Sequence, residues 1–136
     1  MRTEEDTIQQ HAVKFLTAFG RADVAWFAVP NGEKRHASVG AKLKRQGVRT
    51  GAPDLVFLID GHFHGVELKA LKGSPSPAQI AFRLDIERAG GSYHLCRGLD
   101  EAIACFEAIS VLQPNIRLRF PATADRPCGV RERPRA

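Results

Sequence analysis

Two acidic residues and one lysine lie in or beside apolar segments that are typical of β-strands. Asp54 directly precedes one such segment, Leu55–Ile59, and Glu67 and Lys69 lie within the next, residues 63–70. Two carboxylates and an ammonium group, if brought together, could hold a hard divalent cation such as Mg²⁺ and balance the charge of a phosphate. Whether these side chains meet depends on how the two segments pair.

Asp60-Gly61 separates the two segments and is typical of a two-residue β-hairpin turn. With that turn, antiparallel pairing places Asp54 opposite Glu67, with Cβ atoms about 4.5–5.5 Å apart. Two carboxylates at that distance repel, so a fold retains them more readily when a cation lies between them. A three-residue loop would place Leu68 opposite Asp54 instead. In the alternative interpretation, Asp54 only begins a strand, and Glu67 with Lys69 forms a solvated face of an edge strand.

The remaining sequence alternates helix-like and strand-like segments. Thr3 followed by Asp6 resembles a helix-capping box, and Ser76-Pro77 with Gln79 begins a second capped helix. This order of elements predicts an α/β fold with a mixed sheet flanked by helices. The expected helices cover residues 4–19, 37–46, 76–90 and 100–112, and the expected strands cover residues 24–29, 54–59, 63–70 and 92–96.

Pro53-Asp54 followed by Glu67-Leu68-Lys69 resembles the PD-(D/E)xK nuclease signature, and the wider pattern is similar to its VRR-NUC branch. The signature alone is a weak pattern, whereas several matching stretches in order are fairly specific. The stretches that carry the resemblance are Glu5 with Ile8-Gln9, VPNG at 29–32, GVRTGAPD at 47–54, Glu67-Leu68-Lys69, and SPAQ at 76–79.

The resemblance implies a restriction-endonuclease-like αβββαβ core and metal-dependent hydrolysis of DNA phosphodiester bonds. By this analogy Asp54, Glu67 and the backbone carbonyl of Leu68 would bind Mg²⁺ or Mn²⁺, with Glu5 completing the metal shell. Lys69 would position or activate the attacking water, and Gln79 would point into the site. The resemblance further implies branched DNA, such as Holliday junctions or flaps, as substrate, and a homodimer with no small-molecule organic cofactor.

Two of these residues also have a simpler explanation. Gln79 is the third residue of the capping box that Ser76 begins, so it could serve only to cap a helix. Glu5 is one of three consecutive acids in the first turn of the first helix, where acidic side chains interact favourably with the helix dipole. The sequence leaves both interpretations open for each residue.

The basic residues are unevenly distributed. The chain has a formal net charge of +5, whereas residues 34–53 contain six lysines and arginines and no acid. Because this segment runs directly into Asp54, we expect it to contact phosphates, which gives affinity without base specificity. A solvated helix face is the alternative. The expected DNA-binding residues are Asn31, Arg35, Lys42, Lys44, Arg45 and Arg49.

Length and composition favour one domain. The chain has 136 residues, and we expect a nuclease-like domain over residues 1–112 followed by an irregular tail, rich in proline and arginine, over residues 113–136. No apolar run approaches the ~20 residues that a membrane helix needs, so no membrane association is expected. The three cysteines form no CxxC pair, which favours a reduced, cytoplasmic protein without structural zinc.

Two other functional classes remain as alternatives to a nuclease. One is a non-catalytic nucleic-acid-binding module that retains the nuclease fold, and the other is an adaptor whose arginine-rich tail docks an acidic partner. The presence of Asp54, Glu67 and Lys69 together argues against both, because neither needs two opposed acids.

Overall fold

The computed structural model describes residues 3–30 and 37–114. Within them, a four-stranded sheet has the order β1 (Ala25–Ala28), β2 (Leu55–Ile59), β3 (His62–Lys69) and β4 (Ser92–Arg97). The first two pairings are antiparallel and the β3–β4 pairing is parallel. The helices are α1 (Glu4–Phe19), α2 (Ala37–Arg45), α3 (Pro77–Arg88) and α4 (Gly98–Ala108). The predicted α/β fold, a mixed sheet flanked by helices, is confirmed.

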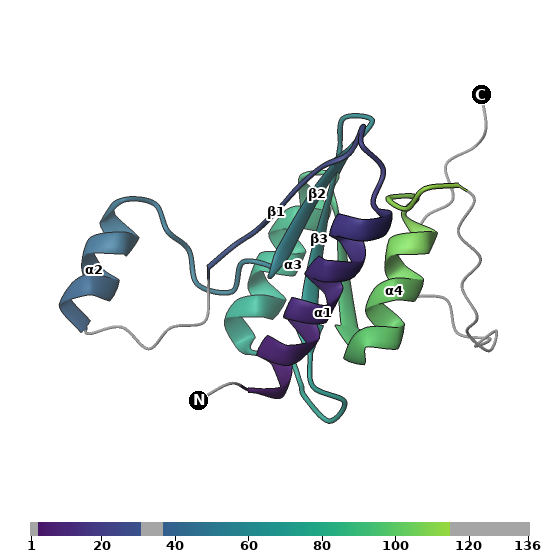
Figure 1. Ribbon diagram of the computed structural model, residues 1–136. Helices are drawn as coiled ribbons and strands as arrows, with labels where there is room; N and C mark the ends of the chain where they lie inside the picture. Colours follow the sequence, from purple (N-terminus) through teal and green to yellow (C-terminus); the bar gives the residue numbers. More distant parts are fainter. Residues whose placement is uncertain (1–2, 31–36, 115–136) are drawn as a thin grey trace.

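The sheet separates two layers of helices (Figure 1). On one face, α1 and α4 pack together and bury the main core, which includes Leu16, Phe57 and Phe106. On the other face, α3 packs against β4, where Arg83 lies over the ring of Tyr93. The parallel step from β3 to β4 thus passes through α3 on the face opposite to the core.

Short stretches of sequence fix the start of α1 and the turn of the hairpin. The hydroxyl of Thr3 accepts the N–H of Asp6 and the carboxylate of Asp6 accepts the N–H of Thr3, so the predicted capping box begins α1. At the hairpin, Asp60 and Gly61 have φ angles of 49° and 75°, which the favoured two-residue turns require. Ile59 pairs with His62, so the alternative three-residue loop is wrong.

The predicted bounds of the last helix are wrong at both ends. The helix begins at Gly98 rather than at residue 100, and the carboxylate of Glu101 accepts the backbone N–H of Arg97, the residue before the helix. It ends at Ala108 rather than at residue 112, where Ser110 adopts a positive φ of 66°. The following residues leave the helix because Leu112 forms an isolated β-bridge with Gly20 at the end of α1.

The basic helix α2 stands apart from the rest of the described chain (Figure 1). It contacts no other described helix or strand, and of its described side chains only Leu43 is half-buried. The tail expected from residue 113 lies, from residue 115 onward, outside the described residues. No described helix is both long enough and apolar enough to cross a membrane.

Candidate active site

The hairpin brings the two acidic residues together. Leu55 pairs with Val66, so extending the register by one residue places Asp54 opposite Glu67, as predicted. Oδ2 of Asp54 accepts the backbone N–H of Leu68 over 2.8 Å. Asp54 therefore has a fixed position against β3 rather than a freely solvated one.

Two glycines allow the segment before Asp54 to approach its neighbours. A Cβ on Gly65 would lie 2.7 Å from Cγ of Pro53, and a Cβ on Gly51 would overlap the backbone of Ala78 at the start of α3. Gly51 was part of the VRR-NUC-like stretch, but Gly65 was not predicted to have a role. The signal for Gly65 was an isolated glycine inside an apolar strand, which often marks a close backbone approach.

Burial raises the pKa of both acids, and the neighbouring Asp54 raises that of Glu67 further. The side chain of Glu67 is only 3% exposed, and its pKa rises to about 9, first because of burial and then because Asp54 lies beside it. Burial also raises the pKa of Asp54, although the hydrogen bond from Leu68 opposes that shift. Oε2 of Glu67 is buried and has no hydrogen-bond partner among the described residues. Without a cation the pair therefore holds a proton at neutral pH.

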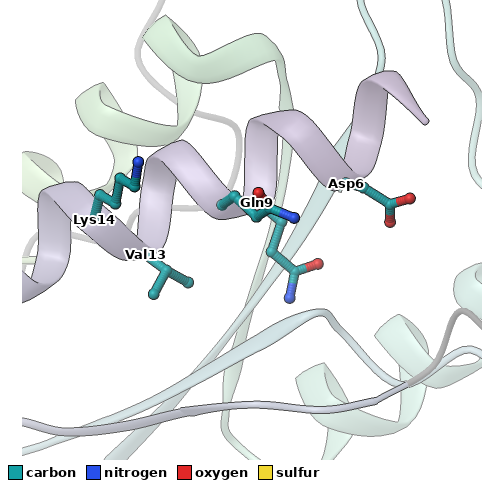
Figure 2. Close-up of a pocket in the computed structure, with 5 residues that line it drawn as sticks. Asp6, Gln9, Val13 and Lys14 are labelled. Carbon is teal, nitrogen blue, oxygen red and sulfur yellow. The ribbon is translucent and has the colours of Figure 1, made fainter. Parts of the chain in front are cut away.

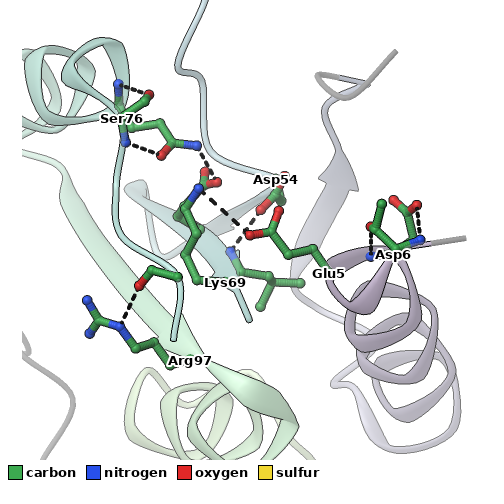
Figure 3. A network of polar contacts seen from close by, with 11 residues as sticks. Glu5, Asp6, Asp54, Lys69, Ser76 and Arg97 are labelled. Atoms are coloured by element: carbon green, nitrogen blue, oxygen red, sulfur yellow. Dashed lines mark hydrogen bonds and ion pairs between the residues drawn. The ribbon is translucent and has the colours of Figure 1, made fainter. Parts of the chain in front are cut away.

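Lys69 and Glu5 complete the cluster. Nζ of Lys69 lies 3.9 Å from Oε1 of Glu5, which the first turn of α1 carries toward the end of β3 (Figure 3). The charge of Lys69 lowers the pKa of Glu67, whereas that of Glu5 raises it. The ammonium group of Lys69 thus lies close to three acidic side chains, one each from α1, β3 and the residue before β2.

Gln79 makes hydrogen bonds that fit both interpretations that the sequence left open. Its side-chain oxygen accepts the N–H of Ser76 over 2.8 Å, and its own N–H donates to the Ser76 hydroxyl over 3.2 Å, which completes the capping box of α3. Its side-chain amide also donates to Oε1 of Glu67 over 2.7 Å. Helix capping therefore aims the amide at the acidic pair.

The oxygen atoms of the acidic pair suit an ion such as Mg²⁺ or Mn²⁺, which keeps some of its waters, better than an ion that protein ligands enclose completely. Within residues 3–30 and 37–114, no group of three or more His, Cys, Asp or Glu side chains is arranged to hold a metal ion. Mg²⁺, however, usually keeps several waters and uses only one or two protein carboxylates together with substrate phosphates. The unpartnered oxygen of Glu67 beside Asp54 meets that requirement.

The expected DNA-binding residues that the structure describes are not gathered at the acidic pair. Lys42, Lys44 and Arg45 are exposed on α2. Arg49 forms a 2.6 Å ion pair with Asp85 of α3 and lies over the ring of Phe82. Asn31 and Arg35 fall outside the described residues.

A separate groove of about 680 Å³ runs along the exposed side of α1. Its lining mixes one acid, one lysine, two amides and one valine (Figure 2). It includes none of the carboxylates of the acidic pair and no nucleophile. The candidate active site is therefore the carboxylate pair between β2 and β3, not this groove.

Comparisons with known proteins identify the fold. No family model and no curated protein matches the sequence. A solved structure described as "VRR_NUC domain protein" is 20% identical with a TM-score of 0.65, and the match covers 79% of this chain and 88% of that one. A second, described as "VRR_NUC domain", is 20% identical with a TM-score of 0.53, over 77% of this chain and 96% of that one. This chain has the fold of the VRR_NUC domain, as its sequence motifs predicted.

Proposed function

We propose that this protein is a metal-dependent nuclease that hydrolyses phosphodiester bonds in DNA. The observation that carries the proposal is the pair formed by half-buried Asp54 and buried Glu67, side by side, with one oxygen of Glu67 lacking a hydrogen-bond partner among the described residues. A protein that only bound nucleic acid would have no use for this pair, because placing a second acid beside a buried one is unfavourable unless a cation or a proton compensates.

The carboxylates of Asp54 and Glu67 and the carbonyl of Leu68 would hold Mg²⁺ or Mn²⁺. When bound, such an ion would neutralise charge on the phosphate and lower the pKa of a coordinated water. The hydrogen bond from Leu68 to Asp54 fixes one carboxylate, and the amide of Gln79 fixes the other. The protein thus holds both acids in place before substrate arrives.

Lys69 supplies the positive charge of the site. Its side chain is only 12% exposed and lies close to Glu5, so its ammonium group is held near the acidic pair rather than in bulk water. In that position it can orient the attacking water and stabilise negative charge that develops on the phosphate. Glu5 positions the ammonium group and can accept a hydrogen bond from water around the metal.

The basic residues of α2 would bind the DNA backbone at some distance from the cleavage site. Lys42, Lys44 and Arg45 are exposed on a helix that contacts no other described element, so their charges are available to phosphates. Arg49 is 47% exposed in its ion pair with Asp85 and would have to exchange that partner for a phosphate. Asn31 and Arg35 are proposed as further contacts from their place in the sequence.

We propose branched DNA, such as a Holliday junction or a flap, as the substrate, and a homodimer as the active form. The support is the resemblance to VRR-NUC nucleases together with the small size of the domain. One such domain encloses only part of a duplex, and two copies could cut two strands.

The test compares cleavage of labelled four-way junction, flap and linear DNA in Mg²⁺ or Mn²⁺. We expect the wild type to cut and Asp54→Asn to be inactive. Asp60→Asn is the matched control, because it makes the same chemical change at the exposed turn of the same hairpin, and it should cut normally. Cleavage that persists in Asp54→Asn would refute the site. DNA binding by all three proteins without cleavage by any would support the non-catalytic binding module instead.

A further inference from the structure

The chain folds back on itself directly after Lys69. The N–H of Gly73 donates to the carbonyl of Ala70 over 2.9 Å, which closes a tight turn. A Cβ on Gly73 would lie 3.3 Å from Cβ of Lys69 and 3.2 Å from the carbonyl oxygen of Ala70. The turn at residues 70–73 therefore lies against the base of the lysine side chain.

Arg97 holds this turn from the neighbouring strand. It pairs with Lys69 in the parallel β3–β4 register, so both side chains project from the same face of the sheet. Its Nε donates to the carbonyl of Gly73 over 3.0 Å, as Figure 3 shows. Its backbone N–H donates to the carboxylate of Glu101 over 2.6 Å. Arg97 is thereby anchored to α4 while its side chain holds the turn.

The same turn leads into the start of α3. Three residues after Gly73, Ser76 caps the helix, and Gln79 then donates to Glu67. The turn thus lies between Lys69, at the end of β3, and the start of the helix that carries Gln79. The side chain of Arg97 ties this turn to β4 through its hydrogen bond to the carbonyl of Gly73.

We propose that Arg97 is a positioning residue, which holds the turn at residues 70–73 so that Lys69 and Gln79 keep their places beside Glu67. This proposal deepens the proposed nuclease function. Its predicted effect on the cleavage rate rests on that function, whereas its predicted effect on the position of Gln79 does not. Arg97 is half-buried and its Nε is committed to Gly73. These features fit a structural clamp better than a direct DNA contact.

The first test is spectroscopic and needs no catalysis. In the metal-free full chain, NMR should show the side-chain amide protons of Gln79 protected from exchange in the wild type and exposed in Arg97→Gln. The backbone amide of Leu68, which is bound to Asp54, should be unchanged. Arg97→Lys should restore part of the protection, because lysine can still donate to the carbonyl of Gly73. Arg88→Gln is the matched control, since Arg88 is exposed in the last turn of α3. Unchanged protection of Gln79 in Arg97→Gln would refute the proposal.

The second test is kinetic. We expect Arg97→Gln to lower the cleavage rate at saturating DNA by about ten- to a hundredfold, the scale of a misplaced catalytic group, with DNA affinity in Ca²⁺ unchanged. Weakened DNA affinity at an unchanged saturating rate would mean that Arg97 contacts DNA, which would refute a positioning role. If the wild type itself does not cut DNA, the proposed function fails, while the NMR result still decides whether Arg97 holds the turn.

A second variant covers the case in which Arg97→Gln does not fold. Gly73→Ala leaves Arg97 intact and crowds the turn, because the new Cβ would press on Ala70 and Lys69. We expect it to increase exchange of the Gln79 amide as Arg97→Gln does. A folded Gly73→Ala protein with wild-type protection of Gln79 and a wild-type rate would contradict the proposed link between the turn and the site.

Discussion

The side-chain amide of Gln79 donates a 2.7 Å hydrogen bond to Oε1 of Glu67, while the oxygen of the same side chain accepts the backbone N–H of Ser76. One residue thus joins the start of α3 to the acidic pair. Because Gln79 both caps α3 and contacts Glu67, the formation of this helix is coupled to the geometry of the site.

Ser76→Ala and Gln79→Ala separate these two roles. Ser76→Ala removes the cap and should reduce the free energy of unfolding by about 1 kcal/mol. Gln79→Ala also removes the partner of Glu67, which should cost about 1 kcal/mol or more in addition, and it should reduce cleavage where Ser76→Ala does not. Urea unfolding and cleavage assays on both variants measure these effects. Equal losses of stability and activity in the two variants would mean that the bond to Glu67 contributes nothing.

The raised pKa of Glu67 predicts a stability that falls with rising pH in metal-free protein. The pKa is about 9 in the folded chain against 4.5 for an ordinary glutamate, so between these values the folded state holds a proton that the unfolded state has released. The free energy of unfolding therefore decreases as the pH rises through this window. Urea unfolding across the neutral range, in EDTA, should show this decrease in the wild type and a flatter profile in Glu67→Gln. A wild-type profile as flat as that of the variant would contradict the raised pKa.

His94 predicts the opposite dependence in acid. It is fully buried on β4, and Nε2 lies 3.1 Å from Nδ1 of His64. Burial is the main cause that lowers its pKa from 6.5 to about 4. The unfolded chain therefore takes up a proton first as the pH falls from 6.5 toward 4, and the free energy of unfolding should fall by up to about 3 kcal/mol.

Acid unfolding of His94→Leu tests this, because the variant should lose the dependence in that window. His11→Gln changes an exposed histidine of α1 and should keep the wild-type dependence. If His94→Leu and the wild type lose stability in parallel over the same pH range, another group is responsible.

The isolation of α2 predicts that its charges affect DNA binding without affecting stability. Replacing Lys42, Lys44 and Arg45 by glutamine should lower affinity for duplex DNA and reduce the slope of log affinity against log salt by about 2 to 3. The unfolding midpoint should stay the same, because α2 contacts no other described helix or strand. Filter binding at several salt concentrations measures the slope, with Arg88→Gln as a single-charge control outside α2. An unchanged slope would show that α2 does not meet phosphates.

Features encoded by neighbouring residues could be predicted from the sequence. The positive φ angles that Asp60-Gly61 favours set the hairpin register and so the facing of Asp54 and Glu67. The capping box at Thr3 and Asp6 set the start of α1. In both cases a few adjacent side chains decide the backbone conformation, so no knowledge of the tertiary fold was needed.

Features that depend on distant contacts could not be predicted. The early end of α4 follows from the bridge between Leu112 and Gly20, which are far apart in sequence. The hydrogen bond between Arg97 and Gly73 joins the end of β4 to the turn after β3, which the parallel β3–β4 pairing brings together. The lack of contacts around α2 is a property of the whole fold, and its apolar and basic pattern resembles that of a packed surface helix.

A paired titration tests most directly whether Asp54 and Glu67 form the proposed metal-dependent cleavage site. Mn²⁺ binding by calorimetry and single-turnover cleavage of a four-way junction are measured on the same protein over the same Mn²⁺ range. We predict that binding and cleavage in the wild type share one midpoint, that Asp54→Asn loses both, and that Lys69→Ala keeps binding but loses most cleavage. Cleavage by the wild type in EDTA, or undiminished Mn²⁺ binding and cleavage in Asp54→Asn, would contradict the account.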